Sequence, residues 1–151
     1  MQAKDLTKEY PRSPLEEVGG FVWLGRLIDK VRAKHAGTLG EYTAFPCGSD
    51  KRFLSTYGIE ADALEQFILS GATDPEIVDW CRQHAQHQPE EMAASHRAAL
   101  LAPVPPEIRD RLEQVKAELA AQRPDLDLAG ADSFTKLILL EEGHPLPAGV
   151  R

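Results

Sequence analysis

The sequence has few cysteines, no long apolar run and no glycine-rich phosphate loop, and each absence excludes a class of protein. Two cysteines in 151 residues are too few for a disulfide framework, so we expect free thiols and a cytoplasmic location. No apolar stretch approaches the roughly 20 residues that a membrane-spanning helix needs. The N-terminus also lacks the apolar core of a secretory signal, so we expect no contact with a membrane.

The glycines do not form a nucleotide-binding motif. Gly37 and Gly40 are isolated, and they lack the strand-to-helix frame in which backbone N–H groups cradle phosphates. We therefore expect no nucleotide cofactor, and the sequence indicates no other cofactor.

Basic residues are outnumbered by acidic ones. The chain has 17 Lys and Arg against 24 Asp and Glu, a net charge of -7. This balance argues against general nucleic-acid binding, because neutralising phosphates requires clustered Lys and Arg. Residues 20–52 differ, with six basic against three acidic side chains, which gives 6 − 3 = +3. Two explanations stay open: this segment faces an external anion, or it attracts the acidic remainder of the chain.

The spacing of apolar residues predicts a helical protein. Hydrophobic residues make up 42% and charged residues 27% of the chain, which is typical of a globular domain. From Phe21 to about His35, apolar residues recur every three or four positions and predict a helix with one buried stripe. Thr73 and Glu76 have the spacing of a capping box at a helix start. Similar patterns predict helices through Phe53 to Tyr57, Leu64 to Ile68, Ile77 to His84, Met92 to Leu100, Ile108 to Leu119 and Phe134 to Leu140.

These elements predict an all-α fold, an irregular bundle of six or seven helices. Residues 39–46 read as an extended stretch that allows one short extended pair. We expect residues 1–20 to form an N-terminal arm, residues 21–142 a single helical domain, and residues 143–151 a loose tail. The proline-rich turn at residues 103–106 is the candidate for a subdomain joint.

A series of motifs in the N-terminal two-thirds of the chain carries a resemblance to a known family. The motifs are Arg12-Ser13-Pro14, Gly19-Gly20, Leu24-Gly25-Arg26-Leu27-Ile28-Asp29-Lys30-Val31-Arg32, Gly37, Gly40-Glu41-Tyr42, Asp50 with Phe53, and Thr73-Asp74 followed by Trp80. With them the chain resembles a small bacterial family classed as a domain of unknown function and found in single-domain cytosolic proteins. The resemblance fades after about Leu101. It implies neither a mechanism nor site residues.

Charged residues of the first predicted helix are the main candidates for a functional site. Arg26 and Lys30 lie one turn apart on one face, where like charges repel unless an anion neutralises them. Asp29 could be that anion, and the charges would then form an internal network. A ligand or an acidic protein partner could also supply it, because guanidinium groups grip carboxylates and phosphates in bidentate fashion. The full candidate set is Arg12, Arg26, Asp29, Lys30, Arg32, Tyr42, Asp50 and Arg52.

The leading interpretation is a non-enzymatic binding or interaction module whose basic patch faces a small anionic ligand or an acidic partner. The alternative is a small enzyme acting on an anionic metabolite, with Asp29 or Asp50 as general base and Tyr42 as proton donor or anchor. That chemistry requires carboxylates whose pKa burial has raised, and the sequence does not reveal burial. The apolar stripe from Ile108 to Leu119 could dock on its own domain or on a second copy, which would make a homodimer.

A metal site is a weaker alternative. Cys81, His84 and His87 are spaced three apart, and His96 could complete a ligand set from the next helix. At about 100° per residue, side chains at this spacing diverge around the helix and cannot all face one ion. We therefore expect no metal, and we interpret Cys81 as a core residue.

Overall fold

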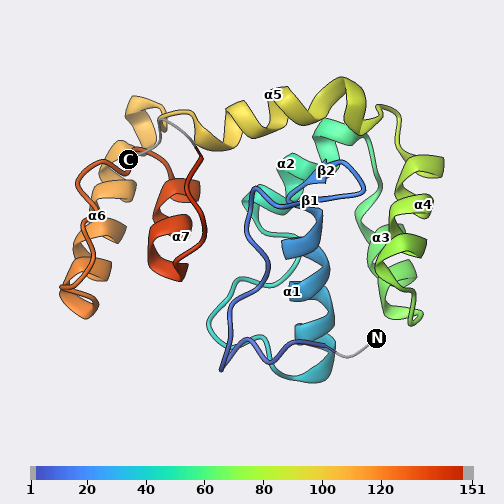
Figure 1. The fold of residues 1–151 in the computed structure, drawn as a ribbon, viewed down its shortest axis with the longest axis horizontal. Helices are drawn as coiled ribbons and strands as arrows, with labels where there is room; N and C mark the ends of the chain where they lie inside the picture. Colours follow the sequence, from blue (N-terminus) through green and yellow to red (C-terminus); the bar gives the residue numbers. More distant parts are fainter. Residues whose placement is uncertain (1–2, 148–151) are drawn as a thin grey trace. The chain divides into compact units, whose positions relative to one another are not determined.

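The computed structural model describes residues 3–147 of the chain (Figure 1). Within that range it contains seven helices and one two-stranded antiparallel pair, so the expected all-α, irregular helical fold is confirmed. The elements are β1 (Glu17–Val18), β2 (Phe21–Val22), α1 (Leu24–Ala36), α2 (Gly48–Tyr57), α3 (Ala61–Leu69), α4 (Asp74–His84), α5 (Pro89–Leu101), α6 (Pro106–Gln122) and α7 (Phe134–Glu142). None of the described helices is long and apolar enough to cross a membrane.

The chain forms two compact units, residues 1–97 and residues 98–151. The boundary falls within α5, a few residues before the turn at 103–106 where the sequence places a joint. The division into an arm, one helical domain and a tail stays a prediction. Residues 1–2 of that arm and residues 148–151 of that tail lie outside the described range.

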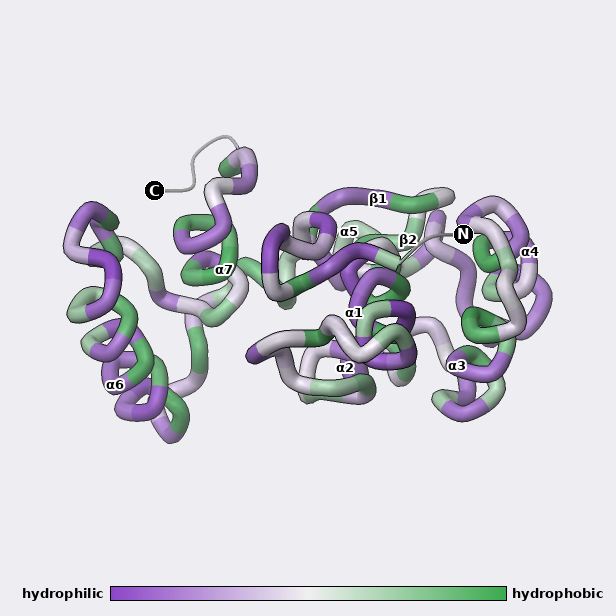
Figure 2. The backbone as a smooth tube through the Cα atoms, turned by 90° about the horizontal axis from the view of Figure 1, so that it is seen from below, coloured by the Kyte–Doolittle hydropathy of each residue, from purple (hydrophilic) through white to green (hydrophobic). Residues whose placement is uncertain are grey.

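The N-terminal unit is built around α1, which contacts both β1 and α3. Figures 1 and 2 both place α3 and α4 next to each other on one side of α1. Nine of the thirteen residues of α1 are buried, far more than a single apolar stripe would bury. Neighbouring rings complete this core: Tyr57 packs edge-on against Phe21 at a centroid distance of 5.0 Å and lies 4.9 Å from Phe53.

Local signals in the sequence set the helix ends. The predicted capping box forms at α4: the N–H of Glu76 donates to Thr73 Oγ1 at 3.3 Å, and the N–H of Thr73 donates to Glu76 Oε1 at 2.9 Å. Gly37 and Gly58 end α1 and α2 with φ values of 77° and 70°, which glycine adopts without steric cost. These ends agree with the predicted helices, which run to about His35 and to Tyr57.

The expected extended pair near residues 39–46 is wrong in its position. That segment contains turns and bends and no strand, whereas residues 17–18 pair with residues 21–22. Gly19 and Gly20 explain the difference, because both have positive φ, as a two-residue hairpin turn requires. The hairpin also takes Phe21 out of the predicted first helix, which begins at Leu24.

The C-terminal unit has its own core between α6 and α7. Leu112, Leu119, Leu128, Ala131 and Leu137 form this cluster. In Figure 2, hydrophobic and hydrophilic segments alternate along α6, as expected for a helix with one buried face. The predicted stripe from Ile108 to Leu119 thus docks partly within its own unit, through Leu112 and Leu119, while Ile108 stays 40% exposed.

Candidate functional site

Seven of the eight predicted site residues belong to connected contacts around α1, and we call Arg12, Arg26, Asp29, Lys30, Arg32, Tyr42, Asp50 and Asp74 the α1 charge cluster. The eighth predicted residue, Arg52, is not part of it. Its side chain is exposed on α2 and forms no hydrogen bond or ion pair with any of residues 3–147.

Arg12 and Asp29 make the densest contact of the cluster. The backbone N–H and Nε of Arg12 donate to Asp29 Oδ2 at 2.8 and 3.1 Å, and Nη2 donates to Oδ1 at 3.0 Å. The side chain of Asp29 is only 5% exposed. This bidentate contact fastens the segment before the hairpin onto α1.

Glycine at position 25 makes room for that contact. Gly25 and Asp29 are one turn apart on α1, and a Cβ built on Gly25 would lie 2.9 Å from Arg12 Nε and 3.1 Å from Val18 Cγ2. Arg12 therefore crosses α1 over Gly25, which has no side chain to obstruct it.

Asp74 extends the cluster to α4 and was missed by the sequence analysis. Its Oδ2 accepts from Arg12 Nη1 at 2.6 Å and its Oδ1 accepts from Arg32 Nη1 at 3.1 Å. Arg32 also donates to the carbonyl of Ala72 at 2.9 Å. The result is an alternating chain of charges, Asp29, Arg12, Asp74 and Arg32. Asp74 was visible only as part of the Thr73-Asp74 motif, since nothing in its local pattern indicates a contact 62 residues away.

The pKa shifts along this chain follow the pairing. Burial disfavours the charge of Arg12, but its hydrogen bonds to Asp29 and Asp74 and the attraction of those carboxylates outweigh burial and raise its pKa. Burial likewise disfavours the charge of Asp74, but Arg12 and Arg32 together lower its pKa. The structure thus favours charged forms that neutralise one another.

Lys30 and Asp50 form a second, fully buried pair. Lys30 Nζ donates to Asp50 Oδ2 at 2.9 Å, and the two side chains are 4% and 0% exposed. Asp50 Oδ1 accepts from Trp23 Nε1 at 2.7 Å, and Oδ2 also accepts from the backbone N–H of Cys47 at 3.0 Å, which caps α2. Lys30 Nζ donates further to Cys47 Sγ at 3.2 Å. Both charges are therefore satisfied inside the unit.

Arg26 links the two parts of the cluster. Its guanidinium lies 5.7 Å from the ring centroid of Trp23 and 5.5 Å from that of Tyr42, within the range of cation–π attraction. Its Nη1 also donates to the carbonyl of Arg12 at 3.4 Å.

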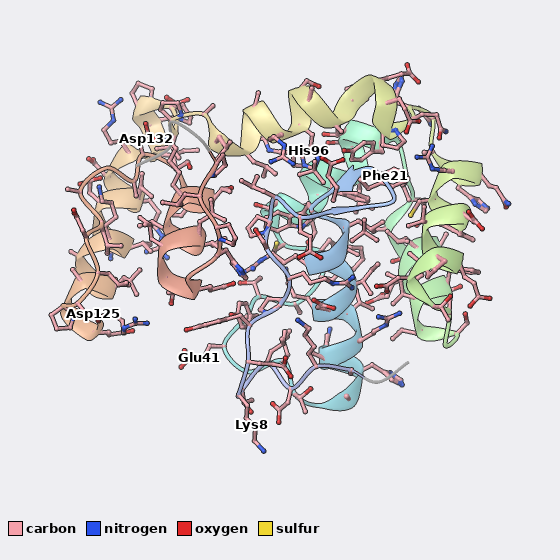
Figure 3. All side chains as sticks on the ribbon, viewed as in Figure 1. Lys8, Phe21, Glu41, His96, Asp125 and Asp132 are labelled. Atoms are coloured by element: carbon pink, nitrogen blue, oxygen red, sulfur yellow. The ribbon has the colours of Figure 1, made fainter. Side chains whose placement is uncertain are left out.

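The candidate metal ligands are dispersed. Cys81 is a fully buried core residue whose burial raises the pKa of its thiol to about 12. His84 stacks on Trp80, whereas His96, labelled in Figure 3, is a buried residue of α5 whose ring packs against those of Tyr57 and Phe53. Among the described residues no group of three or more His, Cys, Asp or Glu is close enough to hold an ion.

The N-terminal unit also has a groove outside the α1 charge cluster. It has a volume of about 620 Å³, which lies within the usual range for ligand pockets of roughly 300–1,000 Å³. It lies between α2, α3 and α4, and we call it the α2–α4 groove. Its lining residues are Lys51, Leu54, Ser55, Gly58, Ile59, Glu60, Ala61, Ala63, Trp80, His84 and Gln86.

Comparison with known proteins assigns the chain to a family. No curated protein matches the sequence. A family model matches residues 8–144, so the similarity continues well past Leu101, where the motif resemblance was expected to fade. The chain therefore belongs to the family described as Domain of unknown function (DUF5069).

Proposed function

We propose that the protein is a non-enzymatic binding module for a small anionic ligand, and that the ligand binds in the α2–α4 groove. The observation that carries this proposal is that Lys51 is exposed and its side chain has no hydrogen-bond or ion-pair partner among residues 3–147. Lys51 also lines the groove. An ammonium group at the edge of an apolar groove attracts an anion of matching size.

The rest of the groove suits a ligand with an apolar body. Leu54, Ile59 and Trp80 contribute apolar atoms to the lining; Leu54 and Ile59 are only 8% and 6% exposed, so the partly exposed Trp80 offers more surface to a ligand. Burying apolar surface contributes about 25 cal/mol per Å². Glu60 is the one acidic lining residue, and its carboxylate accepts from the backbone N–H of Ala63 as the cap of α3. The helix N-terminus partly offsets that negative charge.

The α1 charge cluster, which contains most of the residues that the sequence pattern indicates as an anion site, is less suited to an external anion. Asp29, Asp50 and Asp74 already accept hydrogen bonds from Arg12, Lys30 and Arg32. An external carboxylate or phosphate would have to displace one of these internal carboxylates, at a cost in stability. We therefore infer that the cluster supports the fold, and that exposed cations outside it, such as Lys51 and Arg52, are available for recognition.

The acid–base alternative has less support for the same reason. A general base needs a lone pair directed at a substrate proton. Both oxygens of Asp50 accept from protein donors, and so do both oxygens of Asp29. The two carboxylates also belong to different pairs, with Arg12 and with Lys30.

Thermal unfolding with benzoate, citrate and inorganic phosphate as probes tests the proposal. A ligand at one hundred times its Kd adds about 2.7 kcal/mol, which raises the Tm of a chain of this length by about 5 to 10 °C. We expect at least one probe to raise the Tm of the wild type, and the rise to be lost in Lys51→Met and reduced by salt. Lys34→Met is the matched control, since Lys34 is an exposed lysine on α1. Equal shifts in Lys51→Met, or no shift with any probe, would overturn the proposal.

A further inference from the structure

Three rings stack in sequence at the α2–α4 groove. Phe67 of α3 and Trp80 of α4 lie 5.6 Å apart between centroids with an interplanar angle of 20°. Trp80 and His84, one turn further along α4, lie 4.0 Å apart at 16°. Trp80 and His84 both line the groove. The stack therefore ends at the groove with the imidazole of His84.

The hydrogen bond of His84 determines how its ring is presented. Nδ1 lies 2.8 Å from the carbonyl oxygen of Trp80, and because a carbonyl only accepts, Nδ1 carries the proton. In the neutral ring, Nε2 then keeps a lone pair and can accept from a ligand. One face of the ring is covered by Trp80, and His84 is an exposed residue with no other ring contact among the described residues. The second face is available for stacking.

We propose that the ligand of the groove is a planar aromatic acid, which stacks on the free face of His84 while its acid group binds Lys51. This inference rests on the proposed function and names the chemical class of the ligand. A flat ring extends the ordered stack of Phe67, Trp80 and His84. The ammonium of Lys51, which lines the same groove, can pair with a negative charge on the same molecule. A saturated ring of equal size cannot lie flat on the imidazole and loses this contribution.

Two-dimensional NMR of the labelled protein tests the inference, because the chain has only two tryptophans. The indole N–H of Trp80 reports on the groove. That of Trp23 is an internal control, since Trp23 is 2% exposed and donates to Asp50. The probes are naphthalene-2-carboxylate, its fully saturated counterpart decahydronaphthalene-2-carboxylate, and the neutral naphthalene-2-carboxamide.

We expect naphthalene-2-carboxylate to shift the Trp80 signal and not the Trp23 signal, with an affinity about 2- to 10-fold higher than that of the saturated acid. We expect His84→Ala to remove this preference and His87→Ala to keep it. His87 is an exposed histidine that does not line the groove. The amide is expected to bind more weakly than the acid.

The outcomes separate this inference from the proposed function. If both acids shift Trp80 with equal affinity, or if His84→Ala binds as the wild type does, the aromatic class is wrong and the anion-binding groove stands. If neither acid shifts the Trp80 signal, both the inference and the groove as an anion site are overturned.

Discussion

The guanidinium of Arg12 lies 2.6 Å from the carboxylate of Asp74, 62 residues further along the chain, and the same guanidinium grips Asp29. One arginine thus joins the segment before the hairpin to α1 and to the first turn of α4. The side chains of Arg12 and Asp74 are 17% and 26% exposed, so solvent weakens the pair only in part.

Arg12→Lys should therefore destabilise the protein although it keeps the charge. A lysine cannot reproduce the fork that contacts two carboxylates, so we expect a loss of about 2–3 kcal/mol in the free energy of unfolding. Urea denaturation measures this. Lys8→Ala is the control, because Lys8 makes only a 3.9 Å contact with Asp5 at the surface. If Arg12→Lys changes the free energy of unfolding by less than about 0.5 kcal/mol, the forked contacts of the guanidinium do not stabilise the protein.

Gly25→Ala should also destabilise the protein, against the usual trend for helices. Alanine in a helix is normally favoured over glycine by about 1 kcal/mol. At position 25 the added Cβ would meet Arg12 Nε at 2.9 Å, and such overpacking costs about 1–3 kcal/mol. Gly48→Ala is the matched control, since a Cβ there meets nothing within 4 Å and the residue lies in α2. A gain in stability for Gly25→Ala would contradict the assigned position of Arg12.

Because Lys30 and Asp50 form a buried ion pair, we expect the effects of substituting them on the free energy of unfolding to be strongly coupled. Asp50→Ala would leave the Lys30 ammonium buried without its partner, and such losses amount to about 3–5 kcal/mol. The double variant Lys30→Met with Asp50→Ala should recover part of that loss, although Trp23 Nε1 stays without its acceptor. A double-mutant cycle by urea denaturation measures the coupling. Simple additivity of the two single changes would refute the pairing.

The lowered pKa of the buried His96 makes the stability of the protein depend on pH. Burial, with a smaller contribution from the charge of Arg52, lowers its pKa from 6.5 to about 4, and its Nδ1 lies 3.1 Å from the hydroxyl of Tyr57. Between these pH values the unfolded chain binds a proton that the folded chain does not, so stability falls as pH drops from 6.5 to 4. The full effect is of the order of 3 kcal/mol.

Unfolding free energies measured across this pH range check the prediction. His96→Asn should flatten the slope between pH 6.5 and 4, whereas His35→Asn, at an exposed position, should leave it unchanged. An identical slope in His96→Asn would assign the pH dependence to other groups. Below this pH range Asp74 causes a further loss of stability. Its pKa is lowered by Arg12 and Arg32, so protonating its carboxylate breaks the ion pairs with both arginines.

Helix positions and caps were accessible from the sequence because they depend on neighbours in the chain. The Thr73 and Glu76 box is decided by residues three apart, and Gly58 ends α2 through its own backbone conformation. The hairpin at Gly19 and Gly20 was missed because two strands of two residues each carry no periodic pattern. Its only local signal was the glycine pair, which indicated an interruption of regular structure.

Most members of the α1 charge cluster could be named from the sequence, but their pairing could not. The charged residues of α1 stood out because so many cations shared one short helix, and most of them do gather together. Their partner Asp74 comes from a distant turn, and contacts at that separation leave no trace in a single sequence. The groove was missed for a related reason. No local pattern marks Lys51, Trp80 and His84 as neighbours, and only the packing of the helices brings them to line one groove.

Native mass spectrometry of freshly purified protein, compared with its denatured mass at low and moderate salt, tests the binding account most directly, and it also reads the oligomeric state. We expect the wild type and Lys34→Met to retain a small acid of defined mass that Lys51→Met releases. Retention of that mass by Lys51→Met, with its loss in Arg12→Lys, would contradict the account, because the anion would then be bound at the α1 charge cluster.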